Sequence, residues 1–92
     1  MRVDISTFGT SLVSRPLGRE AALALTANVL RAIPHEEIVE LDFSKVLALT
    51  PSWADEFLMT LREHGGNQIK VLPSHNASVK LTLETIGEKM TA

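Results

Sequence analysis

The chain has 92 residues, of which 45% are hydrophobic and 22% are charged, and its net charge at pH 7 is −2. This length and composition predict one folded domain, residues 1–92, rather than a disordered chain. The small negative charge and the 4% content of aromatic residues argue against nucleic acid binding, which needs a basic surface or stacking rings. The absence of cysteine excludes a disulfide, a thiolate metal site and a thiol nucleophile.

The hydrophobic residues are distributed in short runs. None of these approaches the eighteen or so consecutive apolar residues of a membrane span, and residues 1–4 lack the apolar region of a secretion signal. We therefore expect a cytoplasmic protein that does not associate with a membrane.

The first segment of the chain is predicted to be a strand. Residues 2–6 alternate between apolar and polar side chains, as a half-buried strand does. A loop at residues 7–11 follows, and Leu12 and Val13 can add a short extended piece.

The first predicted helix covers residues 17–33, where apolar side chains recur at helical spacing. Ser14 is a candidate N-cap and Pro16 suits the first turn, because proline lacks the amide that a helix start leaves unpaired. Pro34 should end the helix, since the residue before a proline disfavours helical geometry.

The central stretch of the chain is predicted to be a strand followed by a second helix. In residues 38–43 apolar side chains alternate with two carboxylates, which indicates a strand with one face against a core. Ser52 is the predicted N-cap of the helix, because Asp55 follows it at the spacing of a capping-box variant. The helix should run to about residue 63 or 64, where a pair of glycines follows.

A third strand is predicted over residues 69–72, which Pro73 ends. Ser74 or Asn76 can cap a last helix. The first part of that helix also alternates like a strand, but the helical pattern continues without a turn signal. Its apolar positions are Val79, Leu83, Ile86 and Met90.

The predicted order is therefore β-α-β-α-β-α, which favours an α/β fold with a small, mainly parallel sheet of three to four strands and right-handed crossovers. Strands in sequence order with such crossovers place the helices mostly on one face. The other face should be charged or thinly covered, because polar side chains alternate with the apolar ones. These polar residues are Arg2, Asp4, Glu40, Asp42 and Lys70.

The central stretch resembles a known family. The segment L-D-F-S-x-V, followed by a polar dipeptide, a serine and a helix, is similar to the STAS domain of sulfate-transporter tails and anti-sigma factor antagonists. The closer resemblance is to a smaller STAS-like family of unknown function, and it extends over residues 3–87. The positions that carry it are Phe8-Gly9, Ser14-Arg15, residues 42–46 (D-F-S-x-V) and residues 51–56 (P-S-W-A-D-E).

This resemblance implies a signalling domain that binds a protein partner, with a kinase-like ATPase as one candidate. In anti-sigma factor antagonists, a partner kinase phosphorylates a serine at the start of the second helix, and this controls partner binding. The corresponding position here is Ser52. The chain departs from the antagonists at the next residue, where bulky Trp53 stands in place of a small side chain.

Ser52 also has a purely structural interpretation, since a serine cap stabilises a helix by about 0.5–2 kcal/mol without any further role. In the functional interpretation, a phosphate on Ser52 meets free amide groups and the positive end of the helix dipole. Thr50 and Ser44 are weaker candidate phosphoacceptors. Thr50 also belongs to the predicted partner-binding surface.

Four further residues complete the predicted partner-binding surface. Trp53 lies on an apolar helical stripe, so it is either a core residue or a partly exposed interface anchor. Asp55 and Glu56 either form an acidic edge or simply favour the helix dipole. Arg15 can pair with Asp55 or with Asp42, or it can receive a phosphate or a partner carboxylate.

The sequence offers no argument for catalysis or for a bound cofactor. Its three histidines lie in separate turns without metal-ligand spacing, and no nucleophile, base and orienting acid can be assigned together. We therefore expect a non-enzymatic interaction domain that binds a protein through the loop and N-terminus of the second helix. A small-molecule-binding domain or enzyme subunit using the strand-end crevice, and a homodimer formed through the less covered sheet face, remain alternatives.

Overall fold

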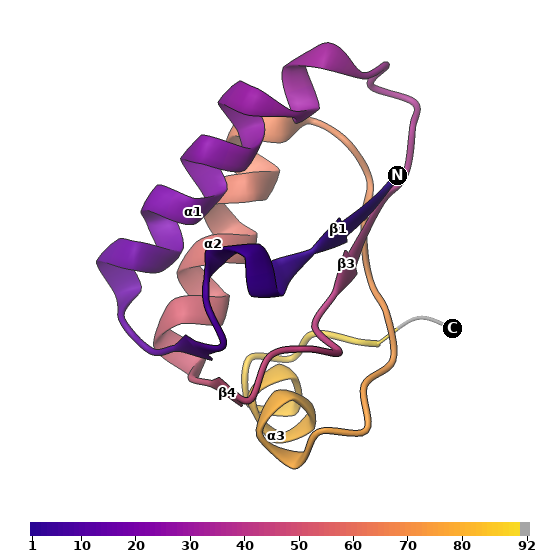
Figure 1. Cartoon of the computed structure of the whole chain (residues 1–92). Coiled ribbons are helices and arrows are strands. Elements are labelled where there is room, and N and C mark those ends of the chain that lie inside the picture. The colour runs from indigo at the N-terminus through magenta and orange to yellow at the C-terminus, as the bar shows by residue number, and fades with distance from the viewer. Residues whose placement is uncertain (91–92) are drawn as a thin grey trace.

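The computed structural model describes residues 1–90 and contains a three-stranded parallel sheet with helices packed beside it (Figure 1). The strands are β1 (Arg2–Asp4), β2 (Ser11–Leu12), β3 (Val39–Asp42), β4 (Ala48–Leu49) and β5 (Ile69–Val71). The three-stranded sheet has the order β1-β3-β5, and β2 and β4 form a separate parallel pair. The predicted α/β class with a small parallel sheet is confirmed, although β4 is a strand that the sequence did not indicate.

Within the described residues, three α-helices and two short 3-10 helices connect the strands. They are α1 (Arg15–Asn28), α2 (Pro51–Gly65), α3 (Ala77–Thr85), η1 (Ile5–Phe8) and η2 (Leu30–Ala32). α1 and α2 run side by side along one face of the three-stranded sheet, and α3 lies beside β4 at the end of the molecule (Figure 1). The prediction that the helices occupy mostly one face is therefore confirmed.

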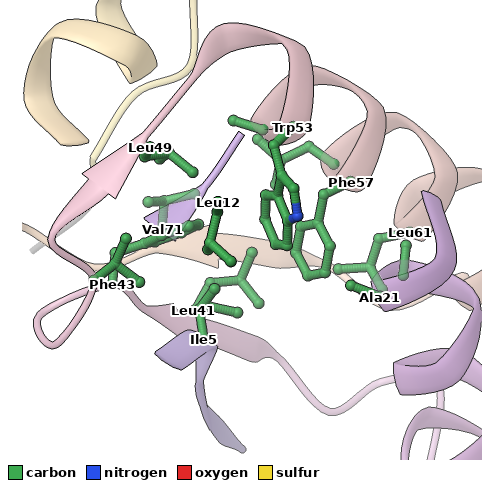
Figure 2. Close-up of a cluster of buried hydrophobic side chains, with 14 of the residues drawn as sticks. Ile5, Leu12, Ala21, Leu41, Phe43, Leu49, Trp53, Phe57, Leu61 and Val71 are labelled. Carbon is green, nitrogen blue, oxygen red and sulfur yellow. The ribbon is translucent and has the colours of Figure 1, made fainter. Parts of the chain in front are cut away.

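The core lies between this sheet face and the helices (Figure 2). Val39 and Leu41 of β3 and Val71 of β5 project into this core and are almost fully buried. Trp53 and Phe57 reach into the same space from α2, and their rings stack with centroids 4.7 Å apart. The alternation that predicted a one-faced sheet thus reflects one continuous apolar core.

The opposite face of the sheet carries the charged residues. Arg2, Glu40 and Lys70 are register partners across the three strands, and Asp4 is the register partner of Asp42. All five residues are exposed or half-exposed. This face is therefore polar and thinly covered, as the sequence predicts.

The first strand is shorter than predicted. Residue 6 was expected to lie in it, but β1 ends at Asp4 and η1 begins at Ile5. The Asp4 carboxylate accepts hydrogen bonds from the Ser6 amide (3.0 Å) and the Ser6 hydroxyl (2.7 Å), so it caps the 3-10 turn. The extended piece predicted at Leu12 and Val13 is β2, shifted by one residue to Ser11–Leu12.

The first helix also ends earlier than predicted. It was expected to reach residue 33, but α1 stops at Asn28 because Val29 has a non-helical backbone (φ −126°, ψ −57°). The chain continues as η2, and Leu30 remains buried. The apolar spacing beyond Asn28 therefore reflects packing against the core, not a continuing α-helix.

The last helix departs from the prediction at its end. Asn76 is its N-cap, with Oδ1 accepting from the Val79 amide at 3.1 Å, which decides between the two predicted caps. The prediction that the helix extends through Met90 is wrong, because α3 ends at Thr85 and Gly87 turns the chain with φ +76°. Met90 instead forms a parallel bridge with Val71 at the edge of the sheet.

Candidate functional site

The second helix begins at a different cap from the one predicted. Thr50 is the N-cap of α2, since its Oγ1 accepts from the Trp53 amide at 3.4 Å. Pro51 is the first helical residue, where proline is favoured, and this places the cap one position before it. The prediction that Ser52 caps the helix is therefore wrong.

Thr50 also connects the starts of the two long helices. Its hydroxyl donates to the Val13 carbonyl at 2.8 Å, and its amide donates to the Leu12 carbonyl at 3.0 Å. Val13 directly precedes Ser14, whose Oγ caps α1 by accepting from the Leu17 amide at 3.3 Å. The N-termini of α1 and α2 are thus held next to each other, at the carboxyl ends of β2 and β4.

The third helix holds β4 from the other side. Ser78 Oγ accepts from the Leu49 amide at 3.0 Å, and the Thr82 hydroxyl donates to the Leu49 carbonyl. The Asn76 side-chain amide donates to the carbonyls of Val46 and Leu47. These contacts fix the segment that leads into the first turn of α2.

Ser52 lies in this first turn with its side chain exposed. Within residues 1–90, no group makes a hydrogen bond with its hydroxyl. The hydroxyl is therefore open to chemical modification, and the first-turn amides and the helix dipole favour negative charge at this place. The weaker candidate Ser44 is also exposed, but it lies in the turn after β3, where its amide donates to Asp42 Oδ1 at 2.9 Å.

Trp53 is a core residue. Only 1% of its surface is exposed, and Figure 2 shows its ring pointing inward beside that of Phe57. The alternative prediction of a partly exposed interface anchor is therefore wrong. Because the indole points away from the surface, it also leaves the neighbouring Ser52 uncovered.

Arg15, Asp55 and Glu56 come together at the surface between α1 and α2. Arg15 Nη1 lies 3.1 Å from Glu56 Oε2 and 3.4 Å from Asp55 Oδ2, and Arg19 Nη1 lies 3.8 Å from Glu56 Oε1. The predicted pairing of Arg15 with Asp55 is confirmed, whereas the alternative pairing with Asp42 is not formed. Exposed ion pairs of this kind contribute only about 0–1 kcal/mol each, so their main effect is to orient the side chains.

A shallow hollow of about 260 Å³ opens between β2 and the start of α1, and the ion-paired residues Arg15, Asp55 and Glu56 do not line it. Val13 and Leu17 are 52% and 57% exposed at its rim, and Trp53 forms part of its base. Sequence reasoning did not select Val13 or Leu17. The available signal was that two apolar residues flank the Ser14 cap without belonging to the apolar stripe of α1. The full lining is Phe8, Ser11, Leu12, Val13, Leu17, Glu20, Ala21 and Trp53.

The carboxylates on the open face of the sheet form a second polar cluster. The backbone and side chain of Ser44 hold the pKa of Asp42 below its ordinary value of 3.8 by hydrogen bonding to the charged form. The Ser6 hydroxyl has the same effect on the pKa of Asp4, which also lies 3.4 Å from Lys45 Nζ. Both carboxyl groups are therefore ionised at neutral pH, side by side in the register of β1 and β3.

Comparisons of the chain with protein-family profiles, with characterised proteins and with solved structures return no match. Among the residues that the structure describes, no group of three or more His, Asp or Glu side chains is placed to hold a metal ion. No helix in the described part of the chain combines the length and the apolar character needed to cross a membrane.

Proposed function

We propose that this chain is a non-enzymatic, STAS-like interaction domain that binds a protein partner at the joined N-termini of α1 and α2. The docking surface consists of Val13, Leu17, Arg15, Ser52 and Asp55. The observation that carries the proposal is that two largely exposed apolar side chains and an unbonded serine all lie at the two helix starts that the Thr50 hydrogen bonds hold together. The sequence resemblance to STAS domains, in which this region binds partners, supports the same place.

The shape of the surface favours a protein over a small molecule. Small-molecule pockets usually enclose about 300–1,000 Å³ and bury most of the ligand. The hollow at Val13 and Leu17 measures only about 260 Å³, and its rim consists of exposed apolar side chains rather than converging polar groups. Exposed apolar side chains accompanied by charged residues on the surrounding surface are typical of a protein interface.

The class of partner follows from the resemblance alone. By analogy with anti-sigma factor antagonists, we propose a kinase-like ATPase in the same cytoplasmic compartment. Its surface should offer an apolar side chain for the hollow between Val13 and Leu17. Because Arg15 is already shared between Asp55 and Glu56, the partner should rearrange these ion pairs when it binds.

Co-purification from the native host tests this surface. Leu17→Ser removes an exposed apolar contact without touching the core, and Leu81→Ser on α3 is a matched control, since Leu81 is 66% exposed. The partner should be retained by wild type and by Leu81→Ser, and should be lost from Leu17→Ser. Equal recovery with both variants would show that the docking surface is assigned to the wrong place.

Phosphorylation of Ser52 is the second candidate function. It is favoured by the exposed hydroxyl of Ser52, by the capping role of Thr50, which leaves that hydroxyl unbonded, and by the inward direction of the Trp53 ring. A phosphate adds close to two negative charges at the helix N-terminus and accepts strong hydrogen bonds from arginine. It would therefore compete with Asp55 and Glu56 for Arg15 and change the charge of the docking surface.

Mass spectrometry of the protein isolated from its host tests this candidate, together with the affinity of a Ser52→Asp variant for the partner. The modified form should be present under some growth conditions, and Ser52→Asp should alter partner affinity while Ser44→Asp should not. An unmodified Ser52 under every condition, with unchanged affinity of Ser52→Asp, would remove the phosphorylation hypothesis and leave the docking surface standing.

A further inference from the structure

The outer edge of β1 is an unpaired strand edge. β1 pairs with β3 on one side only, and within residues 1–90 no other strand lies along its outer side. The opposite edge of the sheet differs, because Met90 forms a bridge with Val71 of β5. An open edge can accept a further strand through its free backbone groups.

The backbone groups of β1 are oriented for such a pairing. The Glu40 amide donates to the Met1 carbonyl at 2.7 Å, and Glu40 is the register partner of Arg2. In a parallel ladder, this arrangement turns the amide and carbonyl of Arg2 and the amide of Asp4 away from β3. Beside this edge runs a hollow of about 370 Å³ that lies between β1 and α1 and includes Val3 and Phe8 among its lining residues. α1 therefore leaves space for a further strand along β1.

The sequence of the edge is self-complementary in charge. β1 reads Arg2-Val3-Asp4, with a cation and a carboxylate at equal distances from the central valine. If two copies pair in antiparallel fashion about Val3, Arg2 of each copy lies opposite Asp4 of the other. The amides of Arg2 and Asp4 also point outward, so each backbone hydrogen-bonded pair between the two copies would join an arginine and an aspartate.

In a single copy of the chain, two carboxylates repel each other at this edge. Asp4 and Asp42 are register partners on adjacent strands, and the charge of Asp4 opposes ionisation of Asp42. The cation closest to Asp4 is Lys45 at 3.4 Å, whose side chain is 73% exposed. Like charges directly opposite each other destabilise a sheet, and an arginine on the free side of Asp4 would relieve this repulsion.

We propose that the β1 edge is a dimerisation surface for a second copy of this chain, formed by antiparallel β1–β1 pairing with Val3 at the two-fold axis. The two three-stranded sheets then form one continuous six-stranded sheet. The two-fold symmetry sends the docking surfaces of the two copies to opposite ends of this sheet, so both stay open to partners. This mode differs from a dimer through the polar face of the sheet, because it uses the backbone edge.

Light scattering over a concentration series tests the proposal, with any purification tag at the C-terminus. Wild type should approach twice the 10.1 kDa mass of the chain as its concentration rises. Arg2→Glu should weaken dimerisation roughly tenfold or more, because two opposite-charge pairs become like-charge pairs. Arg31→Glu makes the same charge change at an exposed residue of η2 and should leave dimerisation unchanged.

Two further variants separate edge pairing from a general charge effect. Arg2→Pro removes the outward amide while keeping the ladder to β3, since proline is tolerated where the amide of an edge strand faces solvent; it should abolish the dimer. An equimolar mixture of Arg2→Glu and Asp4→Arg should restore a dimer that neither forms alone, because each cation again faces a carboxylate. A wild-type chain that keeps the single-chain mass at every concentration overturns the proposal. The proposal is also overturned if Arg2→Pro or Arg2→Glu dimerises as strongly as Arg31→Glu.

Discussion

A Cβ atom placed on Gly18 would lie 2.5 Å from the backbone oxygen of Trp53. Real Cβ atoms do not come this close to a backbone atom, so α1 and α2 touch here through their backbones. This contact lies in the first turns of both helices, directly below the docking surface. Gly18 therefore sets how closely the two helix starts approach, and with them the spacing of Leu17 and Ser52.

We predict that Gly18→Ala destabilises the protein by about 1–3 kcal/mol, because the added methyl group forces the two backbones apart. In an ordinary helical position the same change stabilises by roughly 0.5–1 kcal/mol, so the sign of the effect is informative. Urea denaturation gives the free energy of unfolding. Gly65→Ala is the matched control, since the nearest atom to its added Cβ is the movable end of the Leu30 side chain at 3.0 Å. A Gly18→Ala variant as stable as wild type would contradict the close contact.

The two hydroxyl residues at the start of α2 should behave differently. Thr50→Ala should lower the free energy of unfolding by about 0.5–2 kcal/mol, because it removes both the helix cap and the hydrogen bond to Val13. Ser52→Ala should change it by no more than about 0.5 kcal/mol, since its hydroxyl is exposed and unbonded among the described residues. Thermal or urea unfolding of the two variants measures the difference. A larger loss of unfolding free energy in Ser52→Ala than in Thr50→Ala would show that Ser52 is the cap.

The burial of Trp53 leads to a separate prediction. Trp53→Ala should destabilise the fold by about 3–5 kcal/mol, because it empties a fully packed position against Phe57. Asp55→Ala, two residues later on the exposed side of the same helix, should cost less than about 1 kcal/mol. Unfolding midpoints of the two variants provide the measurement. A small effect of Trp53→Ala would mean that the indole lies at the surface in solution.

The open sheet face should give the protein a specific acid sensitivity. The pKa of Asp42 is lower in the folded state than its ordinary value of 3.8, so its ionised form stabilises the fold above that pH. This contribution is lost as the pH falls through the lower folded-state pKa. Asp42→Asn should therefore be less stable than wild type at neutral pH. The free energies of unfolding of the two proteins, plotted against pH, should converge below about pH 3.8. Unfolding free energies measured from pH 7 to pH 2 test this, and parallel curves would contradict it.

The fold was largely predictable because its main signals are local. The alternation around Glu40 and Asp42 identified the central strand and its polar face, and the strand–helix order led to the parallel sheet. Residue type and position identified Ser14 as a cap and narrowed the cap of the last helix to Ser74 or Asn76. These features depend on side-chain periodicity and on backbone hydrogen bonds that neighbouring residues determine.

The errors concern features that depend on tertiary contacts or on very short elements. β4 has only two residues, Ala48–Leu49, and too few positions to show a period. The apolar stripe allowed Trp53 to be a core residue but did not decide it, since the backbone contact of Trp53 with Gly18, 35 residues earlier in the chain, leaves no periodic signal. The cap of α2 was within reach of sequence reasoning, because Pro51 favours the first helical position and so indicates Thr50.

The central claim is that a protein partner binds the docking surface around Leu17, and the affinity of the purified partner tests it most directly. Calorimetric titration should be carried out with wild type, Leu17→Ser and Leu81→Ser, after circular dichroism has shown that all three are folded. We expect Leu17→Ser to weaken binding about tenfold or more, the loss typical of a residue that contributes above 1 kcal/mol, and Leu81→Ser to bind like wild type. Equal affinities for all three proteins, or a loss confined to Leu81→Ser, would contradict the account.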